Sequence, residues 1–274
     1  MKRKITKTKG LNLKQWLLIA GLSVSVVSTS YAVEDEFWLD VQNNKLGSVT
    51  KYLAQGVDPN IQSREKQPAI MWAIQNEAWR VYDLLRQHRA FDPNAANGLD
   101  ETPLMYLAIL GDMDRAQALI AQGAKINRLG WSPLHYAASK GQVPMAQMLI
   151  AKGALINAPA PDGTTPLMMA ARSGSGKMVN LLLAQGADPT TLNIAKLSAA
   201  DWAESNKEPR LAERLREVAA AYEQQRRQNQ GEVKALLIDE TIEQTPDSVD
   251  RAAQMQAGSS QYFDLKRFDE PVAP

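Results

Sequence analysis

The side chains able to carry acid–base, nucleophilic or metal chemistry are few and scattered in this chain of 274 residues. It has no cysteine, which excludes disulfides, thiolate catalysis and cysteine-based zinc sites. Of its two histidines, His88 has no Asp, Glu or His at metal-ligand spacing, and the sequence has no G-x-S-x-G motif. Residues 173–177, S-G-S-G-K, lack the spacing and the preceding strand of a phosphate loop. We therefore expect no enzyme activity, no cofactor and no metal site.

The chain instead repeats itself with a period near 33 residues. The pattern W-S-P-L-H-Y-A-A-S-K-G at Trp131 returns at Glu101 and Thr164, and a faded copy starts at Lys66. A second landmark, such as Q-G-A-K-I-N, follows each copy at similar intervals. This landmark ends at Asn60, Asn94, Asn127, Asn157 and Thr190. Two independent landmarks with one period indicate a stacked repeat protein.

Each copy predicts a helix, a tight turn, a second helix and an extended loop. Thr or Ser before Pro starts the first helix, as at Thr102-Pro103 and Ser132-Pro133, because the hydroxyl can cap the free amides. A glycine after the second helix, such as Gly153, sits where a left-handed cap is expected.

These copies resemble the ankyrin repeat, whose signature is Thr-Pro-Leu-His-x-Ala with a period of about 33 residues. The resemblance covers about residues 36–225. It implies an all-α solenoid of about five to six helix-turn-helix repeats joined by short β-hairpin-like loops. It also implies capping repeats at both ends and a structural role for His135, which would bond the backbone of a neighbouring loop. Each repeat would contact only its neighbours.

One loop departs from the pattern. The Asn-to-Pro segment spans nine residues in 94–103 and in 157–166, but only six in 127–133. We therefore expect a stunted loop beside Trp131.

The chain divides into three parts. Residues 1–32 resemble a bacterial signal peptide, with six basic residues before an apolar run of about 13 and small residues at Ser30 and Ala32. Cleavage near Ala32-Val33 would give a periplasmic or secreted protein; the alternative is an uncleaved inner-membrane anchor. Residues 33–228 are expected to form the repeat domain, and residues 229–274 an acidic, largely disordered tail. An aromatic segment in that tail, 261–269, is either a linker or a docking segment.

The charge balance argues against a nucleic-acid partner. The whole chain has a net charge of +1, with 31 basic and 30 acidic residues. Without the six basic residues of the leader, 25 basic residues face 30 acidic ones. No basic excess is left to hold phosphates.

In the ankyrin family, partners bind the concave face, which is built from the loop tips and the ends of the first helices. Ile109, Leu110 and Trp131 stand out there as large apolar residues. Trp131 and Leu110 either contact a partner or pack together to cover the short loop. Position by position, the resemblance predicts these contact residues: Lys66, Ile74, Gln75, Glu101, Ile109, Leu110, Trp131, Ser139, Lys140, Thr164, Arg172 and Ser173.

We therefore expect a non-enzymatic, periplasmic protein-binding module that is monomeric alone. The first interpretation is an immunity or inhibitor protein for a toxic effector such as a lipase. One alternative is an accessory protein for a periplasmic oxidative-stress enzyme such as a catalase. The other is a membrane-anchored envelope scaffold, which requires the leader to be retained.

Overall fold

The computed structural model describes the backbone of residues 35–237 and the side chains of residues 35–229. The predicted leader (1–32) and the aromatic segment 261–269 lie outside the described residues. Within them the chain is helical, with a single isolated bridge between Gln62 and Pro68 in place of strands. No helix in this part of the chain combines the length and apolar character that crossing a membrane requires.

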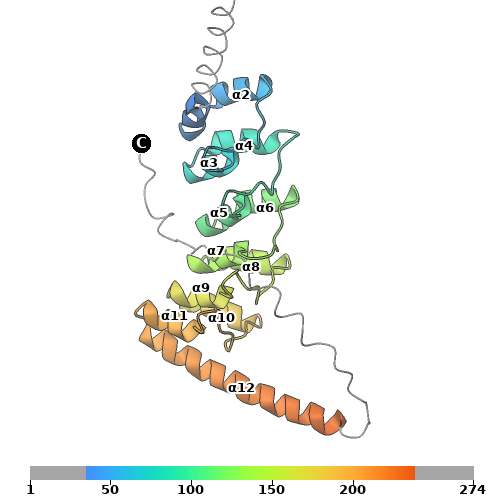
Figure 1. Ribbon diagram of the computed structural model, residues 1–274, viewed down its shortest axis with the longest axis vertical. Helices are drawn as coiled ribbons and strands as arrows, with labels where there is room; N and C mark the ends of the chain where they lie inside the picture. The colour runs from blue at the N-terminus through green and yellow to red at the C-terminus, as the bar shows by residue number, and fades with distance from the viewer. Residues whose placement is uncertain (1–34, 238–274) are drawn as a thin grey trace, which may run out of the picture.

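The helices form two rows. The row of first helices comprises α3 (Ala69–Gln75), α5 (Pro103–Leu110), α7 (Pro133–Ser139), α9 (Pro166–Arg172) and α11 (Ala199–Ser205). The row of second helices comprises α2 (Leu46–Ala54), α4 (Trp79–Gln87), α6 (Met113–Ala121), α8 (Val143–Ala151), α10 (Gly176–Ala184) and α12 (Pro209–Leu237). Residues 35–42 are also helical and precede α2. Figure 1 shows the pairs stacked in one elongated column. The predicted all-α repeat solenoid is confirmed.

The core lies between the rows and continues from repeat to repeat. Each first helix packs on the first helix before and after it, so that α7 lies between α5 and α9. Small residues make this approach close: Ala137, Ala138, Ala170 and Ala171 are completely buried. Because every layer shares its core with its neighbours, the stack is one continuous hydrophobic cluster.

The regular spacing of the second landmark along the chain has a structural reason. Four asparagine side chains each bridge to the next repeat, accepting from one backbone amide and donating to one backbone carbonyl. The donations run from Asn60 to Ala90 (2.7 Å), Asn94 to Gly123 (3.0 Å), Asn127 to Gly153 (2.7 Å) and Asn157 to Gly186 (3.0 Å). The acceptances come from Asp92, Lys125, Leu155 and Asp188, at 2.7–2.9 Å. We call this series the asparagine ladder. The ladder provides hydrogen-bond partners for backbone amides and carbonyls of the turns, which the stacking of helices alone would leave unpaired.

His135 joins two repeats in the same way. Its Nδ1 lies 2.9 Å from the Ser132 hydroxyl, and its Nε2 lies 3.1 Å from the carbonyl oxygen of Thr164 in the next loop. Complete burial lowers the pKa of His135 to about 4. This confirms the structural role that the resemblance implies for it.

The loops turn like short hairpins. In four of them the backbone amide at the start donates to the carbonyl four residues later. These pairs are Ser63–Gln67, Asn97–Glu101, Ala160–Thr164 and Asn193–Leu197, at 2.8–3.0 Å. The residue before the closing position has a positive φ, as in Asp100 (62°) and Gly163 (77°). The short loop turns at Gly130, with φ 80°.

Aligning the first copy with the others by its proline places its residues one position out of register. Pro68 is the N-cap of α3, whereas Pro103 is the first residue of α5. Lys66 was expected to correspond to Glu101, but its φ of 59° places it at the position of Asp100. The residue that matches Glu101 is Gln67, because both close their loops.

The C-terminal end of the stack is closed by α12. Ala212 and Leu215 are buried against α11, and Arg216 pairs with Glu204. The helix then continues well past the stack, and its side chains from 220 to 229 are exposed. It reaches Leu237, nine residues beyond the expected domain end at 228.

Candidate functional site

The face built from the loop tips and the ends of the first helices holds the predicted contact residues, but their exposure differs. Lys66, Leu110 and Lys140 are exposed, and Leu110 has 49% of its surface accessible. Four are half-buried: Gln75, Trp131, Arg172 and Ser173. Five are buried and cannot offer their side chains to a partner: Ile74, Glu101, Ile109, Ser139 and Thr164. For these five the structure does not support a contact through the side chain.

Three of the five are buried because the last turn of each first helix still faces the core. Ile74 occupies the place that small residues such as Ala108 take in other repeats, and both are covered by neighbouring helices. Ser139 turns its hydroxyl inward and donates to the carbonyl oxygen of Tyr136 at 2.7 Å. Ile109 is only 4% exposed. The outward position is the next residue along, which is Leu110 in α5.

Thr164 closes a loop instead of pointing out of it. Its hydroxyl donates to a carboxyl oxygen of Asp162 at 2.9 Å, and its backbone amide donates to the other at 2.9 Å. Its carbonyl is the one that faces His135. The side chain therefore fixes the loop shape from within.

Glu101 is the centre of a polar network that the sequence did not reveal. It is 3% exposed, and one carboxyl oxygen accepts from the Tyr136 hydroxyl at 2.5 Å. The other accepts from Asn97 Nδ2 at 2.7 Å and lies 3.4 Å from the Tyr106 hydroxyl. These bonds join the second loop to both α5 and α7. A buried carboxyl group needs such partners, because its desolvation is costly without them.

The network continues into the preceding repeat. Asn97 Nδ2 also donates to Gln67 Oε1 at 3.1 Å, and Gln67 Nε2 donates to Gln75 Oε1 at 3.0 Å and to the Tyr106 hydroxyl at 3.2 Å. Three successive repeats are thus cross-linked beneath the face. The one sequence signal was the tyrosine at equal positions of two neighbouring copies, Tyr106 and Tyr136.

Trp131 packs onto its own repeat. Its ring lies edge-on to the His135 ring, with centroids 5.3 Å apart and planes at 78°. It is half-buried against the core. The fully exposed apolar group of the short loop is its neighbour Leu129, with 96% of its surface accessible. The sequence argument placed the anchor at Trp131 and overlooked Leu129.

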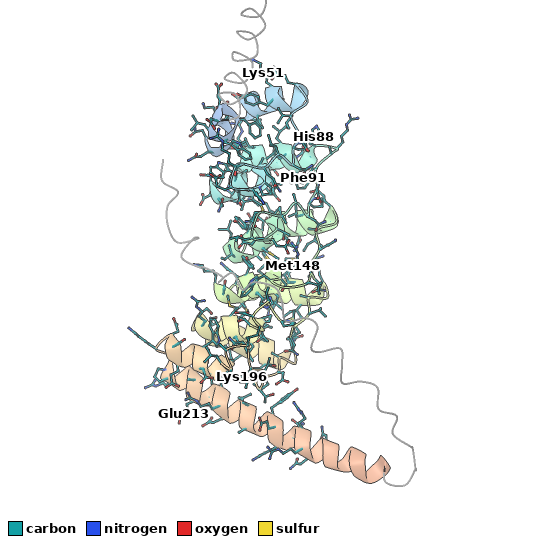
Figure 2. The ribbon with its side chains drawn as sticks, viewed as in Figure 1. Lys51, His88, Phe91, Met148, Lys196 and Glu213 are labelled. Carbon is teal, nitrogen blue, oxygen red and sulfur yellow. The ribbon has the colours of Figure 1, made fainter. Side chains whose placement is uncertain are left out.

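Two further features border this face. The Arg172 guanidinium lies over the ring of Trp202, 5.3 Å from its centroid, which explains why Arg172 is only half-exposed. Leu99 and Ile194 are exposed in other loops, with 45% and 71% of their surfaces accessible. Figure 2 labels His88 toward one end of the stack and Lys196 toward the other.

Away from the face, His88 lines an open cleft of about 550 Å³ between the turns that follow α2 and α4. Its Nδ1 accepts from the Ala90 amide at 3.2 Å, so the ring shapes the local turn. No group of three His, Cys, Asp or Glu gathers at metal-binding distance within the part of the chain that the structure describes. The arrangement offers contact surface.

Comparison with known proteins identifies the family of the chain from its repeats. A family model described as ankyrin repeats, in three copies, matches residues 37–129, 78–160 and 104–193. These overlapping matches together extend over residues 37–193, which is more than half of the chain. No curated protein matches it. Repeats of this kind are generally protein-binding modules without enzyme activity. The repeat period, the paired helices and the matching family model show that the chain belongs to the ankyrin-repeat family.

Proposed function

We propose that this chain is a periplasmic protein-binding module that holds one specific protein against the face made by its loop tips and first-helix ends. The observation that carries the proposal is Leu110. It is half-exposed at the end of α5, a helix whose other residues are all buried. A large apolar side chain held in this way on a rigid surface is the kind of anchor on which protein interfaces depend.

The surface around Leu110 is ordered before any partner arrives. The Glu101 network ties α5 and α7 to the second loop, and His135 ties α7 to the loop that follows it. A partner would therefore not have to order these groups, which lowers the free-energy cost of association. Exposed Lys140, one repeat further on, supplies charge at the rim.

Within this role we propose an inhibitor or immunity protein that blocks a toxic effector after export. The expected signal peptide and the absence of cysteine support export by a route that does not depend on disulfide formation. The same surface would serve an accessory protein for an oxidative-stress enzyme, and the identity of the captured protein separates the two roles. Retention of the leader would instead make the chain a membrane-anchored scaffold.

The test compares two exposed leucines. The chain, expressed with its leader, is isolated from the periplasm after chemical cross-linking, and its N-terminus is sequenced. We expect a start at Val33 and one predominant cross-linked protein. Leu110→Ser should abolish that cross-link, whereas Leu155→Ser, which changes a leucine that is 59% exposed in the turn after α8, should leave it unchanged. Equal capture by both variants would show that the partner binds elsewhere.

A further inference from the structure

Apolar residues stand at the tips of four successive loops. They are Leu99, Leu129, Pro161 and Ile194, and each of them is exposed. The first loop carries Arg64 and Glu65 instead. Tips of tight turns normally hold Gly, Pro, Asn, Asp or Ser, because these residues suit the turn backbone. Exposed Leu99, Leu129 and Ile194 are therefore unexpected on a surface that serves only solubility, whereas Pro161 is an ordinary turn residue. We call these four residues the loop-tip ridge.

The ridge is fixed by contacts between neighbouring loops. The Arg128 guanidinium donates to a carboxyl oxygen of Asp100 at 2.6 Å and joins the second loop to the third. The Ile194 amide donates to the carbonyl of Asp162 at 2.8 Å and joins the fourth loop to the fifth. Between them, Gly130 lies so close to Pro161 that an added Cβ would stand 3.4 Å from its ring. The tips are thus held in place as one surface.

Two lysines at the ends of this row occupy a strained backbone position. Lys66 and Lys196 have φ values of 59° and 62°, in the left-handed region where glycine is the favoured residue. Glycine does take the equivalent place in the third and fourth loops, at Gly130 and Gly163. Asp100 shares the conformation in the second loop, but its carboxyl group pairs with Arg128.

Both lysines are exposed, and the bonds that stabilise each loop come from its backbone and other side chains. A side chain kept at a position where glycine would be less strained indicates a task for that side chain. The nearby acidic groups already have partners, since Glu65 accepts from the Ser63 hydroxyl, Asp100 pairs with Arg128 and Asp162 accepts from Thr164. The ridge is therefore an apolar row with an ammonium group at each end.

We propose that the loop-tip ridge binds an extended segment of the partner protein that has an apolar centre and acidic residues toward both ends. This rests on the proposed function and specifies its partner. Stacked helices lie about 8–10 Å apart, so Lys66 and Lys196, four loops apart, are separated by roughly 40 Å. An extended chain rises about 3.3 Å per residue, and about 12 residues bridge that span. Carboxylates at the ends would meet the lysines while the centre covers Leu129.

The probe is a synthetic 12-residue peptide, a length taken from the estimate of about 12 residues above, with two Glu at each end and a centre of Leu, Ile and Ser. The control peptide keeps the centre and carries Lys at the ends. Binding to the purified chain is followed by fluorescence anisotropy. We expect the acidic peptide to bind at least about tenfold more tightly at low salt, with the difference shrinking as salt screens the end charges. Leu129→Ser should weaken both peptides about tenfold, because each loses the same apolar contact.

Changes at the two lysines give the more decisive test of the proposal. The double change Lys66→Gly with Lys196→Gly should weaken the acidic peptide about fivefold or more and leave the control peptide unchanged, while the thermal midpoint of unfolding rises because the backbone strain is relieved. Loss of binding together with gained stability cannot come from damage to the fold. Lys152→Gly, which changes an exposed lysine after α8 with an ordinary φ of −91°, is the control for charge alone.

Several results would overturn the proposal. Equal affinity for the two peptides, no binding of either, or no effect of the lysine changes would each do so. A concentration-dependent dimer that Leu129→Ser dissociates would assign the ridge to a second copy of the chain. If the cross-linked periplasmic partner is lost with Leu110→Ser but kept with Leu129→Ser and with both lysine changes, the ridge proposal fails while the proposed function stands. If no partner depends on either leucine, the proposed function itself fails.

Discussion

Acid should weaken the stack through His135. The bond to the Thr164 carbonyl assigns the ring proton to Nε2, so Nδ1 is an acceptor. That nitrogen faces two donors of Ser132, the amide at 3.2 Å and the hydroxyl at 2.9 Å. A proton added to Nδ1 would face the Ser132 amide donor, require the hydroxyl to turn round, and place a charge inside a completely buried site. Burial accordingly lowers the pKa of His135 to about 4, against an ordinary value of 6.5.

The size of the effect follows from that difference. Between about pH 6.5 and pH 4 the unfolded chain binds a proton at this histidine and the folded chain does not, so stability falls as the pH falls through that window. Each pKa unit corresponds to about 1.4 kcal/mol, and the loss by pH 4 is about 3 kcal/mol. Domains are typically stable by only about 5–15 kcal/mol, so one residue would remove a large share.

The measurement is urea unfolding, followed by circular dichroism at pH 7 and pH 4, for the natural chain and for His135→Met. Methionine fills the same position in two neighbouring repeats, where Met105 and Met168 accept from the N-cap amide at 3.4 Å. It keeps that contact but cannot titrate. Carboxyl groups affect both proteins alike, so the natural chain should lose about 3 kcal/mol more. Equal losses in the two proteins would refute the assignment of acid sensitivity to His135.

Three further outcomes follow from the packing. Tyr136→Phe removes a donor from the buried Glu101 and should cost about 1–3 kcal/mol in urea unfolding, with the far-UV spectrum unchanged. Asn94→Ala breaks one step of the asparagine ladder and should cost about 1–2 kcal/mol by the same measurement, whereas Asn76→Ala, which removes only a bond within its own repeat, should cost less. Gly163→Ala should lower the thermal midpoint and cost about 1–3 kcal/mol, because φ is 77° and the new Cβ would stand 3.2 Å from the Asn193 backbone. No loss in that last variant would show that the loop can rearrange.

The repeat period was sufficient to predict the fold, because helix caps and small residues recur at fixed places. It also led to the short loop, while the role of His135 was implied by the resemblance to the ankyrin repeat. The position of the landmark asparagines was visible, but their bridging bonds were not, since a bond to the backbone of another repeat leaves no mark on the partner's residue type.

The face was harder to predict, because its geometry depends on single backbone conformations. Glu101 was expected to point outward, but the left-handed turn at Asp100 directs it inward onto Tyr136. A shift of one residue at Pro68 displaced Lys66 from its assumed counterpart. Burial in a stacked helix also changes within one residue, which is why Ile109 is covered and Leu110 is not. The spacing of residues in the sequence does not distinguish between positions that differ by a single residue.

The asparagine ladder has a direction. Each side chain reaches toward the C-terminal neighbour, from Asn60 to the turn at Ala90 and onward to Gly186 from Asn157. Every turn in the series is therefore held by the repeat that precedes it in the chain. A chain that emerges N-terminus first, from a ribosome or from an export channel, presents the supporting asparagine before the turn that it supports, so each new repeat can dock onto one already formed. Assembly of this stack can thus run from its N-terminal end toward its C-terminal end, with each layer serving as the template for the next.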